Sequence, residues 1–120
     1  MSDDSFIFWS TYDRVGRKVE LSGSVFTNKI LPKHKELSPE LIKEAVEKSH
    51  YITSDPNYPK RSRYYKIMTH PVNDVSHLTH LKVVAHHDEN EYGKVITAYI
   101  LTSLKNESDQ GALIYDAGQD

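Results

Sequence analysis

The sequence predicts one α+β domain, in which two N-terminal helices pack on one face of a mainly antiparallel sheet of about five strands. Two observations predict this class. Apolar runs with strand-like alternation flank polar turns in the second half of the chain, and two stretches with helical periodicity come before them. Consecutive strands joined by short loops tend to be antiparallel neighbours, which favours a sheet built of hairpins. A chain of 120 residues can bury an ordinary apolar core.

The clearest pair of strands lies at Leu81–Ala85 and Val95–Leu101. Both runs are rich in β-branched residues, and the polar segment Asp88–Lys94 between them supplies turn chemistry. Side chains alternate between the two faces of a strand, so the second run should have one apolar face and one mixed face. The apolar face has Ile96, Ala98 and Ile100, and the mixed face has Val95, Thr97, Tyr99 and Leu101. The mixed face is a candidate floor for a site.

The other elements follow from apolar periodicity and from cap and turn residues. Ser38 and Pro39 form the strongest helix start, because Ser caps a helix and Pro fits its first position. Prolines, Asn and Asp mark the segments 54–59 and 70–77 as loops. The remaining predicted strands are Phe6–Tyr12, Val19–Leu21, Tyr51–Thr53 and Arg63–Thr69, and the predicted helices are Val25–Leu31 and Ser38–Ser49.

Composition excludes several classes of protein. The chain has no cysteine, which excludes disulfides and cysteine-based catalysis and suits the cytoplasm. It has no apolar run of transmembrane length and no signal-peptide pattern at its start, so we expect no membrane association. We expect residues 1–104 to form the domain and residues 105–120 to form an acidic C-terminal tail, either solvated or covering a basic patch.

The segment Lys60–Lys66, KRSRYYK, is the strongest chemical signal, with four cations and no acid. Arg and Lys neutralise phosphates, and Tyr stacks on bases or donates a phenolic proton. Alternate positions of a strand project to opposite sides, so the whole segment cannot face one ligand. The two sets are Arg61, Arg63 and Tyr65 against Tyr64 and Lys66. The alternative interpretation is an edge strand whose charges prevent edge-to-edge pairing.

Histidine is the other candidate group. His34 lies between Lys33 and Lys35, and nearby cations disfavour the imidazolium, which would keep the ring available as a base. It could equally be a surface histidine in a polar connection. Five more histidines fall within His70–His87, but no HExxH or Cys/His spacing occurs among them, so we predict no metal site and no cofactor.

Two longer segments, KHKELSPELIKEAVEKSHYITSDPNYPKRSRYYKI and LKVVAHHDENEYGKVITAYI, carry a resemblance. Together they resemble the barnase/EndoU/colicin/RelE-like (BECR-fold) ribonuclease superfamily, in its small phage- or toxin-associated branches. The resemblance covers about Leu31–Leu101 and rests on a His before the second helix, a basic-Tyr strand and a final hairpin ending in VITAY. Lys35 stands where the family pattern has Pro, and the net charge of −2 is mildly acidic for an RNA-binding protein.

The resemblance implies a metal-independent ribonuclease of toxin type, which uses the 2′-hydroxyl of RNA as the nucleophile. It implies RNA as a partner, and a cognate antitoxin or inhibitor protein as another. The implied catalytic residues are His34, Arg61, Tyr65, Thr97 and Tyr99, and the implied RNA-binding residues are Lys60, Arg63, Tyr64 and Lys66.

Two other functions remain open at this point. One is a non-catalytic binding module of the same architecture, such as a phage or immunity-type protein. The other is a metal-dependent hydrolase that uses the histidines of His70–His87. The sequence shows residue types but not whether the side chains lie close together. Whether His34, Arg61 and Tyr99 meet on one surface is therefore the observation that best distinguishes these functions.

Overall fold

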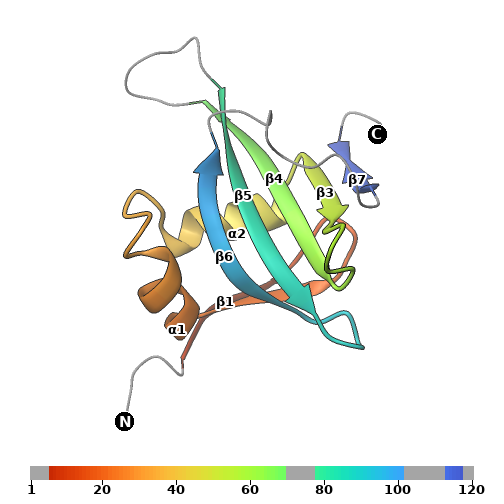
Figure 1. Cartoon of the computed structure of the whole chain (residues 1–120), viewed down its shortest axis with the longest axis horizontal. Coiled ribbons are helices and arrows are strands. Elements are labelled where there is room, and N and C mark those ends of the chain that lie inside the picture. Colours follow the sequence, from red (N-terminus) through yellow and green to blue (C-terminus); the bar gives the residue numbers. More distant parts are fainter. Residues whose placement is uncertain (1–5, 70–77, 102–112, 118–120) are drawn as a thin grey trace.

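The computed structural model describes residues 6–69, 78–101 and 113–117, and it shows an α+β fold with a seven-stranded mixed sheet and two short helical segments (Figure 1). The strand order is β1-β2-β6-β5-β4-β3-β7. The strands are β1 Ile7–Tyr12, β2 Lys18–Ser22, β3 Tyr51–Ser54, β4 Arg61–Thr69, β5 Leu78–His87, β6 Gly93–Leu101 and β7 Leu113–Asp116. The helical segments are α1 Gly23–Val25, continued by the π-helical η2 Phe26–Ile30, and α2 Pro39–Glu47.

The predicted fold class, two N-terminal helices on a sheet of about five mainly antiparallel strands, is therefore wrong. The β1–β2 hairpin precedes the helices and joins the main sheet, because β2 pairs in parallel with the start of β6 through Val19↔Gly93 and Glu20↔Lys94. At the other edge, β7 pairs with β3. Reasoning from neighbouring strands could not find these pairings, because each joins strands that are far apart in the chain.

The second helix begins as its sequence predicts. The Ser38 hydroxyl accepts a hydrogen bond from the backbone N–H of Leu41 at 3.2 Å, which satisfies one of the unpaired donors of the first turn. Its buried face carries Ile42, Ala45 and Val46, at the spacing of one helical stripe. This stripe fixes which face of the sheet the helix covers.

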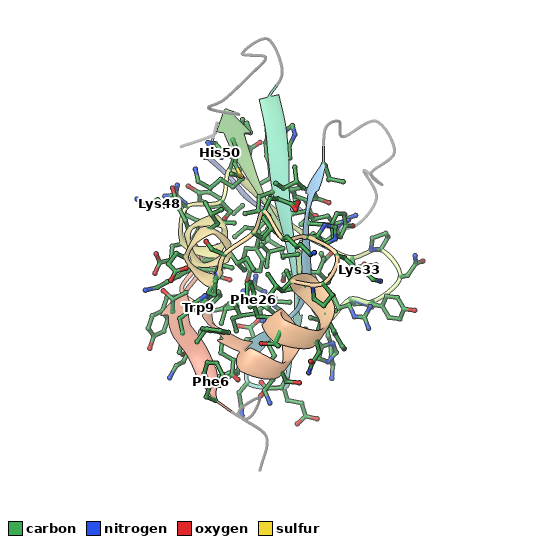
Figure 2. The ribbon with its side chains drawn as sticks, turned by 90° about the vertical axis from the view of Figure 1, so that its left-hand side faces the viewer. Phe6, Trp9, Phe26, Lys33, Lys48 and His50 are labelled. Atoms are coloured by element: carbon green, nitrogen blue, oxygen red, sulfur yellow. The ribbon has the colours of Figure 1, made fainter. Side chains whose placement is uncertain are left out.

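The central strands have one face toward α2 and one face away from it. Residues directly opposite in adjacent strands share a face, and the buried partners Tyr64, Val83 and Ala98 belong to the same core as α2. We call this the helix face. The opposite face of β4, β5 and β6, called the open face, carries none of the described helices, and Figure 2 shows the sheet with α2 on one side only.

A β-bulge changes the faces of β6. Val84 pairs with Thr97, but Ala85 pairs with Val95, so Ile96 has no direct partner in the ladder. Val95 consequently turns into the core, where it is 1% exposed, and Ile96 lines a recess on the other side. The predicted alternation, with Ile96 on the apolar face and Val95 on the mixed face, is wrong at these two positions. Sequence alternation cannot reveal a bulge in the middle of an apolar run.

A buried carboxylate ties the β1–β2 turn to β4. Asp13 Oδ2 accepts hydrogen bonds from the Tyr64 hydroxyl at 2.7 Å and from Arg17 Nε at 3.0 Å. Its Oδ1 accepts from the backbone N–H groups of Val15 and Arg17. Burial raises the pKa of the Tyr64 hydroxyl well above its usual range, and Asp13 raises it further. Tyr64 therefore remains a neutral donor that stabilises this turn.

His87, which lies near Asp13 and Arg17, should make the stability of the fold depend on pH. The ring is 5% exposed, and burial lowers its pKa from the ordinary value of 6.5. Because the unfolded chain binds this proton at a higher pH than the folded protein does, the free energy of unfolding should fall as the pH drops below about 6.5, by at most about 1.4 kcal/mol per pH unit for this group.

Denaturant melts at a series of pH values test this prediction. The His87→Gln variant should lose part of the decline, and His86→Gln, at the exposed neighbouring position, should keep it. Equal declines in the wild type and in His87→Gln would show that other groups cause the effect.

None of the described helices is long and apolar enough to cross a membrane.

Candidate functional site

Cross-strand register arranges the polar side chains of the open face in rows. The first row lies at the β5–β6 turn end of the sheet, and the third lies nearer to the end of β6. The rows are Arg61–His86–Lys94, then Thr53–Arg63–Val84–Thr97, then Tyr51–Tyr65–Lys82–Tyr99. Four cations and three tyrosines thus lie on one face of the sheet, but Arg63, Tyr65 and Lys82 are buried. The members that a ligand can reach directly are Arg61, Lys94, Tyr51 and Tyr99, which suit an anionic, aromatic ligand.

His34 meets the third row at its Tyr99 end. The two rings are stacked, with centroids 6.0 Å apart and planes inclined by 29°. The rings come together because η2 packs against β6. The strand β2 pairs only with Gly93 and Lys94 at the start of β6, which leaves the rest of that edge free for η2. In Figure 2, Lys33, the residue before His34, lies on the side of β6 that faces away from α2.

The backbone around His34 is held at both ends. Its N–H donates to the Ile30 carbonyl at 2.8 Å, and its carbonyl accepts from the N–H of Leu37 at 3.0 Å, which is itself buried. The Nδ1 atom lies 3.9 Å from Glu36 Oε2. Glu36 lies on the Nδ1 side of the ring, so Nε2 is the nitrogen that faces away from this carboxylate. The imidazole is partly exposed, so a ligand can reach it.

Lys82 supplies positive charge beside Tyr99. Its Nζ lies 5.3 Å from the centroid of the Tyr99 ring and 5.8 Å from that of Tyr65, both within cation–π range. The residue is only 8% exposed, so its charge acts in a partly dehydrated setting where electrostatic interactions are stronger than in water. His34, Tyr99, Lys82 and Tyr65 therefore form one continuous group.

The first row lines a recess at the other end of the open face. It has a volume of about 480 Å³ and is lined by Arg61, His86, Asp88, Tyr92, Lys94 and Ile96. The Arg61 guanidinium lies 4.0 Å from the centroid of the Tyr58 ring, and among the described residues its buried Nε has no hydrogen-bond partner. A second hollow of about 370 Å³ adjoins at His86 and includes Tyr58 and Lys60. We call the two together the Arg61 recess.

The predicted site residues divide among four places. His34 stacks on Tyr99, and Tyr65 lies one strand farther along the same row, with Lys82 between the two tyrosines. Arg61 is four residues before Tyr65 on β4, roughly 13 Å away along the strand. Thr97 and Arg63 lie in the row between them, where the Nε atom of the buried Arg63 donates to Thr53 Oγ1 at 2.9 Å. The structure thus separates Arg61 from the histidine with which it was grouped.

Tyr64 and Lys66 are on the helix face. Tyr64 is fully buried and bonded to Asp13, and Lys66 Nζ lies 3.8 Å from Glu44 Oε1 on α2. Neither side chain is on the face that carries the other candidates. Because side chains alternate along a strand, the sequence already indicated that Tyr64 and Lys66 lie on the opposite face from Arg63 and Tyr65. It did not indicate which of the two faces would be covered by the helix.

Four residues of the open face were missed from the sequence: Tyr58, Lys82, His86 and Lys94. One sequence signal existed for Lys82 and His86: they are an even number of positions from His80, so all three should lie on the same face of the predicted strand. Strand register could not be predicted, so nothing indicated that Lys82 would lie opposite Tyr99 or His86 opposite Arg61.

The histidines of β5 do not form a group. His80 and His86 are on the open face about 20 Å apart along the strand, and His87 is on the helix face. Within residues 6–69, 78–101 and 113–117, no three His, Cys, Asp or Glu side chains are placed to hold a metal ion together. His70 and His77 lie outside the described residues.

No protein-family model, curated protein or solved structure matches this chain. Its function has to be inferred from the geometry of its own residues.

Proposed function

We propose that the protein is a metal-independent ribonuclease that binds single-stranded RNA across the open face and cleaves it beside the His34–Tyr99 pair. One observation carries this proposal: a partly exposed imidazole is stacked on a tyrosine ring next to a lysine, on a sheet face that also bears three other cations. These are the groups that transesterification at a phosphodiester requires.

In the proposed reaction, His34 Nε2 accepts the proton of the ribose 2′-hydroxyl. The 2′-oxygen then forms a bond to phosphorus, and the bond from phosphorus to the 5′-oxygen of the next nucleotide breaks. Tyr99 supplies the proton to that departing oxygen, and the charge of Lys82 stabilises the negative charge that develops on the phosphorane. The products are a 2′,3′-cyclic phosphate and a free 5′-hydroxyl.

The charge distribution supports a single-stranded ligand. Arg61 and Lys94 flank one end of the face, and phosphate neutralisation by such cations drives nonspecific RNA binding. Tyr58 and Tyr99 offer aromatic rings on which exposed bases can stack. An inhibitor protein of such an enzyme would have to cover this same face.

Cleavage by the purified protein should persist in EDTA and should fail on RNA with 2′-O-methyl groups. The physical reason is that both the nucleophile and the base are organic groups, the substrate 2′-hydroxyl and the His34 imidazole. Mass spectrometry of the products should find the 2′,3′-cyclic phosphate. Activity abolished by EDTA, or products that end in a 5′-phosphate, would contradict the proposal.

A second candidate function is RNA binding without cleavage. Lys82 and Arg63 are only 8% and 4% exposed, so they can add to the positive potential of the face without contacting a phosphate directly. This arrangement is sufficient for binding. Tight binding of RNA by folded wild-type protein, with no cleavage of any RNA tested, would establish this candidate and remove the first.

A further inference from the structure

The Arg61 recess takes no part in the proposed chemistry. It lies two rows from Tyr99. Arg61 is four residues before Tyr65 on β4, and His86 is four residues after Lys82 on β5. That separation is roughly 13 Å. A single phosphodiester cannot touch both places, so the recess needs a ligand group of its own.

The lining of the recess suits a phosphate. Arg61, His86 and Lys94 are cross-strand neighbours, so their side chains rise from three adjacent strands around one hollow. Arg61 lies against the Tyr58 ring, which fixes the plane of the guanidinium and leaves its N–H edge for an oxyanion.

The same lining suits more than a bare anion. Asp88 is part of the recess, and its carboxylate would repel a phosphate but would accept a hydrogen bond from a base N–H group, such as the N3–H of uracil. Its Oδ1 is already held by the backbone N–H groups of Asn90 and Tyr92, which fixes the carboxylate in place. The exposed Tyr58 ring offers a stacking surface in the adjoining hollow.

We propose that the Arg61 recess is a second nucleotide-binding subsite, which holds the phosphate and base of a nucleotide several positions from the bond that is cleaved. This inference rests on the proposed function and adds a substrate requirement to it. At about 3.4 Å per nucleotide in a stacked strand, the roughly 13 Å between the two places corresponds to about four nucleotides, and to fewer in an extended strand. Short RNA should therefore be a poor ligand and a poor substrate.

The test measures binding of uncleavable 2′-O-methyl oligouridylates of two and six nucleotides, with inorganic phosphate as a competitor. We expect the wild type to bind the hexanucleotide at least tenfold more tightly than the dinucleotide. In Arg61→Ala/Lys94→Ala this advantage should largely disappear, and the slope of log affinity against log salt should fall by about 0.7 for each lost phosphate contact. Inorganic phosphate should compete only weakly.

Lys43→Ala/Lys48→Ala is the matched control, because it removes two cations from the α2 region, and it should keep the length advantage. Lys94→Ala alone changes one exposed side chain and should lose part of it even if the double variant does not fold. An equal length advantage in the wild type and in Lys94→Ala would overturn the subsite, as would equal binding of both oligonucleotides by the wild type.

Cleavage assays with the corresponding unmodified oligonucleotides separate the two proposals. Cleavage of both lengths at the same rate would overturn the subsite while leaving the ribonuclease proposal in place. Length-dependent binding that is lost in Lys94→Ala, without cleavage of any oligonucleotide, would support the subsite and overturn the ribonuclease proposal.

Discussion

His34→Ala should lower the rate of RNA cleavage by about 10²–10⁴-fold, the usual contribution of a general base. Because the imidazole acts on the 2′-proton in the transition state, the loss should appear in kcat, while the affinity for uncleavable 2′-O-methyl RNA changes little. Single-turnover cleavage of a hexanucleotide measures the first quantity, and a binding titration measures the second.

Lys35→Ala, an exposed position beside His34, is the control for nonspecific disturbance of this loop and should retain the wild-type rate. Tyr99→Phe separates chemistry from stacking, because it keeps the ring that His34 contacts and removes only the hydroxyl. A wild-type cleavage rate in His34→Ala would exclude the imidazole as the base and with it the proposed site.

Asp13→Ala should destabilise the fold by about 3–5 kcal/mol, the range found when one partner of a buried charge pair is removed. The substitution leaves Arg17 and the Tyr64 hydroxyl without their acceptor in a buried setting and removes the side-chain acceptor of two backbone N–H groups. A loss of this size is a large share of the roughly 5–15 kcal/mol that stabilises a typical domain. Chemical denaturation measures it.

Asp55→Ala is the matched control for Asp13. Asp55 Oδ1 also accepts two backbone N–H groups, from Asn57 and Tyr58, but those bonds are exposed. Its removal should cost about 1 kcal/mol. Equal losses from the two variants would show that the buried contacts with Arg17 and Tyr64 add no stability.

Local chemistry predicted individual elements better than their assembly. The Ser38–Pro39 helix start depends on atoms within one turn, and it forms as expected. The parallel contact of Val19 with Gly93, by contrast, depends on where the β1–β2 hairpin packs against β6, which no local pattern encodes. The bulge at Ile96 is equally invisible, because Val95 and Ile96 are both β-branched and either could face the core.

The candidate site was predictable in its residue types but not in its grouping. His34 and Tyr99 are 65 positions apart, and only the docking of η2 against β6 brings the rings together. Arg61 shares their face yet lies two rows away, a distance set by strand register. Register depends on the pairing of whole strands, so the sequence of one strand cannot supply it.

The most direct test of RNA binding on the open face is an NMR titration of the folded protein with uncleavable 2′-O-methyl hexauridylate, in which the aromatic ring signals are followed. Rings of the open face, those of His34, Tyr99, Tyr58 and His86, should shift with increasing RNA. The rings of Tyr64 and His87, buried on the helix face, should not shift. Shifts confined to the open face are the predicted result; no shift of His34 or Tyr99 at RNA concentrations that saturate binding would contradict the account.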